Sequence, residues 1–421
     1  MRLASVMAGA TGLRMAALGV SLITNILVAR ELGPSGRGEY TLLLTFVGVV
    51  SAAVGLSGEQ GVTEQSAQGE VIRRRSVSAA FWGAFVVGAL GALLAAGALW
   101  RGVFGLPSGL WWAAAVLTVL TCSQLWCQRL LVLQGQVMTS AVLAVVEATV
   151  FLLGVAVASR MDRLDVDMAL AWYAIGLTAG VMITGIRLRP RVSRRWLAEM
   201  GGILRKGIRY HPGQLALNLM MRVDVLVLGA LGSTTQVGVY SVGLALTAPL
   251  GVLGTAIAST LVAGQVAASE TERRKVTVAL LRITAAVTAV SAVLVAVAAP
   301  IMIPFLWGKD FSGAVPVTWV LLTGAFLLAV QRPIGTYLVA EGMSRAMNRR
   351  ALAGLLVACI ATAALVPQWQ AMGAAVGASL GYLAYVVESI RQFAVRTGRT
   401  SVEVVRAIVR LEGPGEQEFR A

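Results

Sequence analysis

Charged side chains are scarce in this sequence. Asp, Glu, Lys and Arg together make up 13% of its 421 residues, against roughly 25% in a typical soluble domain. Hydrophobic residues make up 57%, so the polar surface that a globular domain needs in water is missing. This composition excludes a chain of soluble domains and predicts that the lipid bilayer is the main solvent of the protein.

Residues that build disulfides, metal centres and many catalytic sites are also rare. Cys122 and Cys127 lie five apart in one apolar run, Cys359 lies alone in another, and His211 is the only histidine. This spacing matches neither a disulfide framework nor a metal site. No phosphate-binding loop or dinucleotide fingerprint is present either. We therefore expect no cofactor, no metal and no catalytic residue, and predict that the protein is not an enzyme.

Long apolar runs dominate the chain instead. About 20 mostly apolar residues are enough to cross the hydrocarbon core of a bilayer. Runs of that length lie near 8–29, 40–62, 76–99, 110–131, 139–158, 168–186, 211–230, 238–264, 278–305, 315–340, 350–366 and 371–390. The sequence therefore predicts an all-α integral membrane protein with about twelve transmembrane helices.

The placement of the positive charges gives the topology. The formal net charge is +15, and the cationic residues gather in alternate loops. They lie at Arg73 to Arg75, from Arg187 to Arg209, at Arg273 to Lys275, at Arg345, Arg349 and Arg350, and in the tail after residue 390. Because cytoplasmic loops carry an excess of Lys and Arg, we expect both termini in the cytoplasm and no nucleic-acid partner. The basic stretches near 187–210 and 391–421 favour surface helices at an anionic membrane surface.

One short sequence pattern occurs twice. The stretch VARELGPSGRGEY from Val28 contains Leu-Gly followed by Gly-Glu-Tyr40, and the stretch from Leu231 contains Leu-Gly followed by Gly-Val-Tyr240. The apolar runs before the two turns also match, with an offset of 199 to 200 residues. Six helices separate the copies, so the repeats have the same orientation. Parallel repeats of this kind are typical of transporters, whose substrate site lies between the halves.

These residues resemble those of a known family. LVARELGPSGRGEY from Leu27 and RYHPGQLALNLMMRVDVLVLGALGSTTQVGVYSVG from Arg209 look like segments of the bacterial polysaccharide and O-antigen flippases, in the multidrug/oligosaccharidyl-lipid/polysaccharide superfamily. YLVAEGMSR from Tyr337 and ALVPQWQAMGAAVGASLGYLAY from Ala364 are similar to later segments of that family. The matching Gly-Ala-Ala segment is missing near ASRMDRLDVDMA, from Ala158.

The resemblance implies an architecture and a function. It implies two pseudosymmetric six-helix lobes around a central cavity, in the plasma membrane of a bacterium. It also implies that a polyprenyl-diphosphate-linked glycan is flipped from the cytoplasmic to the outer leaflet by alternating access, with an ion gradient as the driving force. A glycan polymerase and glycosyltransferases are then candidate partners. The expected parts are an N-terminal lobe at 1–190, a basic linker at 191–210, a C-terminal lobe at 211–392 and a basic tail at 393–421.

Three other functions compete with this one. A multidrug or small-molecule antiporter, or a lipid II flippase, of the same superfamily would share the helices and the repeat. Cationic residues at inner depth favour an anionic lipid-linked substrate over a cationic drug. A membrane-embedded glycosyltransferase would need catalytic acids in a large outer loop, and the longest such loop expected, near 159–167, is short.

Five ionisable residues fall within the apolar runs: Arg14, Glu147, Arg222, Asp224 and Arg332. Charge at the bilayer centre costs about 2.5–3.5 kcal/mol on insertion scales, so such residues mark sites or pairs. We expect Arg14, Arg222 and Arg332 to bind the diphosphate of the substrate, because a guanidinium meets phosphate oxygens as a planar fork. Asp224 and Glu147 are the candidates for proton or sodium coupling. The alternative is a set of structural pairs, such as Arg222 with Glu147.

In a continuous helix, Arg222 and Asp224 would lie about 200° apart, so they would face different neighbours. The repeated turn supplies the remaining candidates. Because the turn marks the start of each lobe, Arg30, Arg37, Tyr40 and Tyr240 are predicted to form an outer gate or the turn of a lobe.

Overall fold

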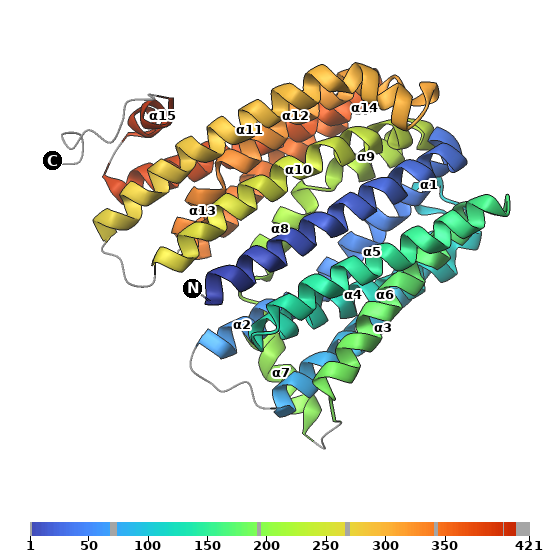
Figure 1. Cartoon of the computed structure of the whole chain (residues 1–421), viewed down its shortest axis with the longest axis horizontal. Helices are drawn as coiled ribbons and strands as arrows, with labels where there is room; N and C mark the ends of the chain where they lie inside the picture. The colour runs from blue at the N-terminus through green and yellow to red at the C-terminus, as the bar shows by residue number, and fades with distance from the viewer. Residues whose placement is uncertain are drawn as a thin grey trace.

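The computed structural model describes residues 2–67, 74–191, 195–265, 270–340, 344–398 and 400–409. Arg73, residues 192–194 of the predicted linker, residue 399 and residues 410–421 of the predicted tail lie outside this part. The described chain contains helices and no strand (Figure 1). The helices are α1 Arg2–Val54, α2 Gly58–Ala67, α3 Arg74–Trp100, α4 Trp111–Leu133, α5 Val137–Arg160, α6 Val166–Leu188, α7 Trp196–Gly207, α8 His211–Met220, α9 Val223–Leu231, α10 Thr234–Gln265, α11 Glu270–Leu306, α12 Ala314–Val330, α13 Arg332–Ala340, α14 Ser344–Thr397 and α15 Ser401–Val409.

Nine helices of the described chain are long and apolar enough to cross a membrane, and the bent pair α8 and α9 adds a tenth crossing. Two of the nine are too long for one crossing, because a straight helix of 46 residues would extend about 70 Å through hydrocarbon about 30 Å thick. Each contains a non-helical residue, Gly33 in α1 and Gln370 in α14, and each therefore consists of two spans. The prediction of an all-α membrane protein with about twelve spans is confirmed.

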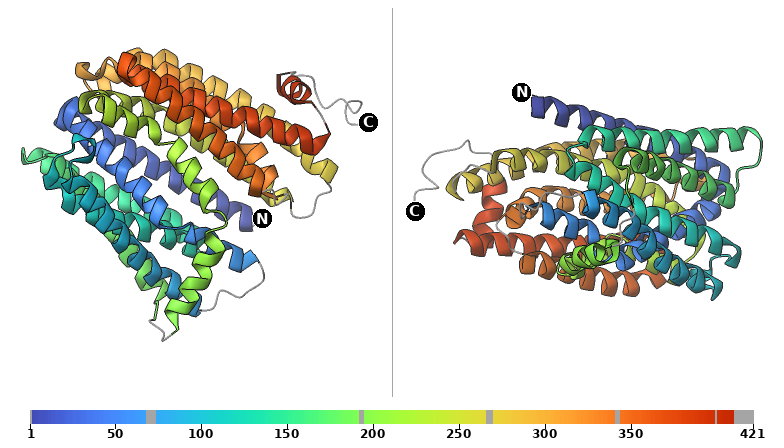
Figure 2. Two further views of the ribbon diagram at one scale, coloured as in Figure 1. Left: turned by 180° about the vertical axis from the view of Figure 1, so that it is seen from behind. Right: turned by 90° about the horizontal axis from the view of Figure 1, so that it is seen from below.

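The spans form two lobes that meet at one end. The blue-to-green helices α3, α4, α5 and α6 pack together in one lobe, and the yellow-to-red helices α10, α11, α12 and α14 pack in the other (Figures 1 and 2). Helix α1 contacts both lobes. The N-terminus and the described end of the chain lie at the same end of the bundle, where the lobes spread apart (Figure 2, left).

The hydrophobic core explains why the lobes meet at the opposite end. The largest buried cluster there contains residues of both lobes, among them Tyr40, Leu42, Val225 and Tyr240. Toward the termini, the clusters around Trp126 and Tyr385 each belong mainly to one lobe. Apolar packing therefore joins the lobes far from the termini, and leaves room between them near the termini.

Two predicted spans differ from the structure. The run 40–62 does not continue as one helix, because α1 ends at Val54 and the chain turns through positive φ angles at Leu56 and Ser57. The run 211–230 is broken between α8 and α9, which are bent by 53°. Helix α7 lies within the predicted linker, and α15 lies within the predicted tail.

Candidate functional site

A cavity of about 740 Å³ lies between the lobes, and its lining includes Ala10 and Arg14 near the start of α1. The start of α1 lies at the end of the bundle where the lobes spread apart (Figure 2, left). The walls of the cavity come from the first half of α1 and from α4, α5, α6, α10 and α13, and they are mostly apolar or small. Three of the five predicted intramembrane charges line it: Arg14 on α1, Glu147 on α5 and Arg332 on α13. The sequence thus identified the ionisable groups of the cavity, although the helices that bring them together are far apart in the chain.

The two cavity arginines are available for a ligand. Arg14 is exposed to the cavity, and the Arg332 Nε atom is buried without a hydrogen-bond partner. Within the described chain, neither guanidinium forms an ion pair with a carboxylate. The residues come from opposite lobes, so an anion held by both would touch both halves of the protein.

Glu147 is held by polar and steric contacts on the cavity wall. Its carboxylate accepts a hydrogen bond from Nε2 of Gln124 on α4. Gly180 on α6 makes room for it, since a Cβ atom added there would lie 1.9 Å from Glu147 Oε1. Gln124 was missed from the sequence, and its amide within the apolar run 110–131 was the available signal. Glu147 therefore has a defined position even without a charged partner.

Arg222 and Asp224 lie at the break in the seventh span. The premise of a continuous helix was wrong, because Arg222 adopts φ −139° just before α9 begins. Its guanidinium packs against Gly48 of α1, where an added Cβ would meet Nη1 at 2.7 Å. It lies outside the cavity lining, but within electrostatic range of the cavity residue Tyr173. No ion pair joins Arg222 to Glu147, although both residues are described.

Asp224 is fully buried away from the cavity. It accepts hydrogen bonds from the hydroxyl of Tyr240 and, at 2.8 Å, from the backbone N–H of Val225. It also lies in the first turn of α9, where the helix dipole favours a negative charge. The predicted coupling residue and one predicted gate residue therefore form a single buried contact.

The repeated turns pack directly on one another. A Cβ atom added at Gly38 would lie 1.7 Å from the carbonyl oxygen of Thr234, and one at Gly238 would lie 1.9 Å from that of Pro34. The hydroxyls of Ser35 and Thr234 are 3.1 Å apart. Each helix after its turn begins beside these contacts, at Pro34 and at Thr234. We call Pro34, Ser35, Gly38, Thr234 and Gly238 the clasp.

Arginines beside the clasp also connect the lobes. Arg30 donates to the carbonyl oxygens of Leu306 at 2.7 Å and Phe305 at 2.5 Å, at the C-terminal end of α11. Arg37 is buried, donates to the Ser241 hydroxyl at 3.2 Å and lies over the ring of Tyr40. These charges of the first turn are cross-lobe contacts, and the clasp holds the far end of the cavity closed.

A family model described as "Polysaccharide biosynthesis protein" matches residues 27–316. This chain belongs to that family. Its helices follow the arrangement of transporters of the MOP superfamily, as the resemblance in the sequence implied. A search of curated proteins gave no match.

Solved structures show the same fold at low identity. The lipid II flippase MurJ in an inward closed conformation superposes with a TM-score of 0.74 at 12% identity, over 94% of this chain and 90% of that one. A multidrug resistance MATE family transporter in an inward-facing conformation gives 0.69 at 12% identity, over 94% and 99%. An outward-facing MATE structure gives 0.61 at 13% identity, over 95% and 96%. All three are transporters or flippases.

Proposed function

We propose that this protein flips a polyprenyl-diphosphate-linked oligosaccharide from the cytoplasmic to the outer leaflet of a bacterial plasma membrane by alternating access. The observation that carries this proposal is the pair Arg14 and Arg332, which face one cavity from opposite lobes without a carboxylate partner among the described residues. Membership of a polysaccharide biosynthesis family supports the glycan as cargo.

The cavity chemistry fits a diphosphate. Guanidinium groups bind phosphate oxygens through charge-assisted, often bidentate hydrogen bonds. Arg14 and Arg332 supply two such groups from separate helices, and the other described residues of the lining are not cationic. A cationic drug would meet repulsion from both arginines, with Glu147 as the only acid among the described residues of the lining. This favours the anionic lipid-linked substrate over the antiporter alternative.

The conformation supports an inward-facing state. With the termini in the cytoplasm, as the charge distribution predicts, the cavity opens toward the cytoplasm and the clasp closes the outer end. The higher TM-score to the inward-facing than to the outward-facing MATE structure agrees with this assignment. Release of the substrate then requires the clasp to open. We also propose that Arg222, near Tyr173 at the cavity wall, meets the diphosphate during that movement.

Ion coupling is assigned to Glu147 and Asp224. Glu147 lines the cavity, so its protonation or sodium binding changes the charge that the substrate meets. Asp224 is buried beside Tyr240 at the start of the second repeat, so occupancy there acts on the lobe contact. An ion shifts a conformational equilibrium only if it binds the two states differently. Closure of the cavity would change the surroundings of Glu147, and opening of the clasp would change those of Asp224, so each acid would bind an ion differently in the two states.

Flipping by the purified protein in vesicles tests the proposal. A fluorescent polyprenyl-diphosphate oligosaccharide is placed in the inner leaflet, and its arrival outside is followed by quenching. We expect Arg14→Ala and Arg332→Ala each to lower the flipping rate at least tenfold, and Arg160→Ala, at the exposed end of α5, to leave it unchanged. Normal flipping by both cavity variants would refute the diphosphate role.

Substrate competition separates the alternatives. An excess of unlabelled lipid II should compete weakly if the oligosaccharide carrier is the true substrate, and strongly if the protein is a lipid II flippase.

For ion coupling, flipping by Glu147→Gln and Asp224→Asn is compared with and without an imposed proton or sodium gradient. Gradient dependence that stays unchanged in both variants would exclude these two residues. The lobe boundaries at 190 and 211, and a glycan polymerase or glycosyltransferases as partners, are parts of the same proposal.

A further inference from the structure

Arg350 is a buried cation in the first half of α14. Its side chain is 4% exposed, and its Nε and Nη1 atoms are buried without a hydrogen-bond acceptor. Its neighbour is the ring of Tyr385, whose centroid lies 5.2 Å from the guanidinium carbon. In the described part of the chain, no carboxylate forms an ion pair with it. Burying an unpaired charge costs several kcal/mol, so an anion from outside the chain would relieve this cost.

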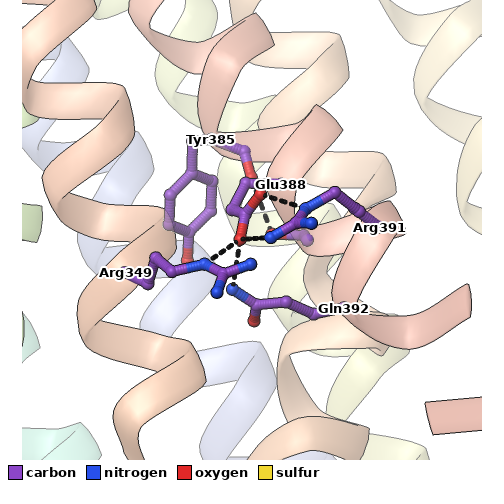
Figure 3. Close-up of polar contacts among 6 residues, drawn as sticks. Arg349, Tyr385, Glu388, Arg391 and Gln392 are labelled. Atoms are coloured by element: carbon purple, nitrogen blue, oxygen red, sulfur yellow. Dashed lines mark hydrogen bonds and ion pairs between the residues drawn. The ribbon is translucent and has the colours of Figure 1, made fainter. Parts of the chain in front are cut away.

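The carboxylate one turn from Tyr385 is already occupied. Glu388 accepts hydrogen bonds from Arg349 Nε at 2.5 Å, Arg391 Nε at 2.8 Å and Gln392 Nε2 at 3.0 Å (Figure 3). Both of its oxygens are engaged by these donors. Arg349 and Arg391 therefore share this acid, while Arg350 has no carboxylate partner among the described residues, so the cluster keeps an excess of positive charge. Arg332 lies within electrostatic range of Arg350 and adds a like charge.

A small pocket joins Arg350 to the start of α8. The pocket has a volume of about 30 Å³, and its lining includes Arg350 and Tyr385 of α14 with Gly213 and Gln214 of α8. Gly213 and Gln214 lie in the first turn of the ten-residue helix α8. In this turn Pro212 has no N–H, and the N–H groups of His211 and Gln214 donate to the carbonyl oxygens of Ile208 and Tyr210. The helix start therefore offers an anion the N–H of Gly213 and the positive end of the helix dipole. The buried guanidinium and the helix start are independent features that both select negative charge.

An apolar groove adjoins this pocket. The groove has a volume of about 460 Å³, is lined by Arg349, Leu352, Ala353 and Leu356, and shares Asn348 with the pocket. Leu352 and Leu356 are 51% and 61% exposed, on a face of α14 that no described element covers. A free ion would make no use of such a groove, whereas an acyl chain fits it.

We propose that the pocket binds a phosphate-type anion. Because the adjoining groove fits an acyl chain, we infer that this anion is the headgroup phosphate of a phospholipid. The pocket is too small for a whole headgroup, so it receives phosphate oxygens while the remainder stays at its mouth. The lipid chain lies along Leu352 and Leu356. This site is separate from the central cavity, since Arg350 does not line that cavity. It would make the stability of the C-terminal lobe dependent on anionic lipid.

Thermal unfolding of the full-length protein in neutral detergent tests this site. Phosphatidylglycerol, phosphatidylcholine and inorganic phosphate are titrated separately, because a ligand of the folded state raises the melting temperature. We expect phosphatidylglycerol to raise it for the wild type and for Arg391→Met, a neighbouring exposed arginine of the same cluster. Arg350→Met should need at least tenfold more of this lipid for the same rise. Without lipid, the Arg350→Met variant should have a melting temperature equal to or above that of the wild type, because the buried unpaired charge has been removed.

Three outcomes would overturn the proposal or part of it. An unchanged lipid response in Arg350→Met would refute the site. An equal loss in Arg391→Met would mean that general surface charge, and not the pocket, attracts the lipid. An equal rise with inorganic phosphate alone would keep the anion pocket but refute its assignment to a lipid. If Arg350→Met does not fold, Arg350→Lys serves in its place, and we expect an intermediate response because the charge remains without the planar fork.

Discussion

Gly38 packs so closely on Thr234 that a Cβ atom at residue 38 would lie 1.7 Å from the Thr234 carbonyl oxygen. The second repeat makes the same contact in reverse, with Gly238 against the carbonyl oxygen of Pro34. Both neighbours are backbone atoms, which cannot move aside as a flexible side chain can. The two backbones can approach this closely only because both positions lack a side chain.

The first prediction concerns these glycines. We expect Gly38→Ala and Gly238→Ala each to destabilise the closed end by about 1–3 kcal/mol, the usual cost of overpacking. Gly19→Ala in α1 is the matched control, because nothing lies within 4 Å of an added Cβ there. Chemical unfolding in detergent measures the cost. Equal stability of all three variants would show that the clasp tolerates a side chain.

The second prediction uses a cross-link across the clasp. With Cys122, Cys127 and Cys359 replaced by Ala, the double variant Ser35→Cys and Thr234→Cys should form a disulfide on mild oxidation, because the native hydroxyls are 3.1 Å apart. The bond should lower flipping at least tenfold, and a reductant should restore it. The two single-cysteine variants are the controls. Full transport by quantitatively cross-linked protein would show that the outer end need not open here.

The third prediction compares the equivalent tyrosines of the two repeats. The Tyr240 hydroxyl donates to buried Asp224, so Tyr240→Phe leaves that carboxylate with one donor fewer. We expect a loss of about 1–3 kcal/mol, the cost of an unsatisfied buried polar group. Tyr40 contributes its ring, which stacks on Phe151 and lies under Arg37. Tyr40→Phe keeps that ring and should change the free energy of unfolding by less than about 0.5 kcal/mol. Equal effects would mean that the Asp224 contact adds no stability.

The fourth prediction concerns Arg30. Its side chain donates to two carbonyl oxygens at the end of α11, where a cation also meets the negative end of the helix dipole. Hydrogen bonds to charged groups contribute about 1.5–3 kcal/mol, so Arg30→Ala should lower the free energy of unfolding by roughly that amount at low salt. Arg160→Ala removes an exposed charge at the same end and should have little effect. An equal loss of unfolding free energy in both variants would mean that Arg30 contributes only as a general surface charge.

The sequence predicted the spans and the repeat because both depend on local composition. Apolar length alone places the crossings, and the Gly and Tyr residues of the two turns keep their spacing. The break before α9 was not predictable in this way, because Met221 and Arg222 include neither Gly nor Pro, the usual causes of a kink. Its origin lies in packing against α1, as the contact between Arg222 and Gly48 indicates.

The site was predictable only in part for a similar reason. Arg14, Glu147 and Arg332 are conspicuous as charges in apolar runs, and the structure places all three on the cavity. Burial of Asp224 and Arg37 depends on how the helices rotate against one another, which composition does not determine. Arg350 was grouped with Arg349 as a loop cation, and nothing in the local sequence separates the exposed neighbour from the buried one.

The clasp also bears on how such a chain arose. Pro34 and Gly38 of the first repeat correspond to Thr234 and Gly238 of the second. The contact of Pro34 with Gly238 is therefore equivalent to the contact of Thr234 with Gly38, and the pair of contacts is symmetric. Self-complementary contact is the property of a two-fold interface between identical subunits. The clasp thus retains the geometry of a homodimer within one polypeptide, with the segment around α7 as the connection that a gene duplication and fusion would introduce. The contacts of Tyr240 with Asp224 and of Arg37 with Tyr40 each occur in one repeat, so they depart from this symmetry.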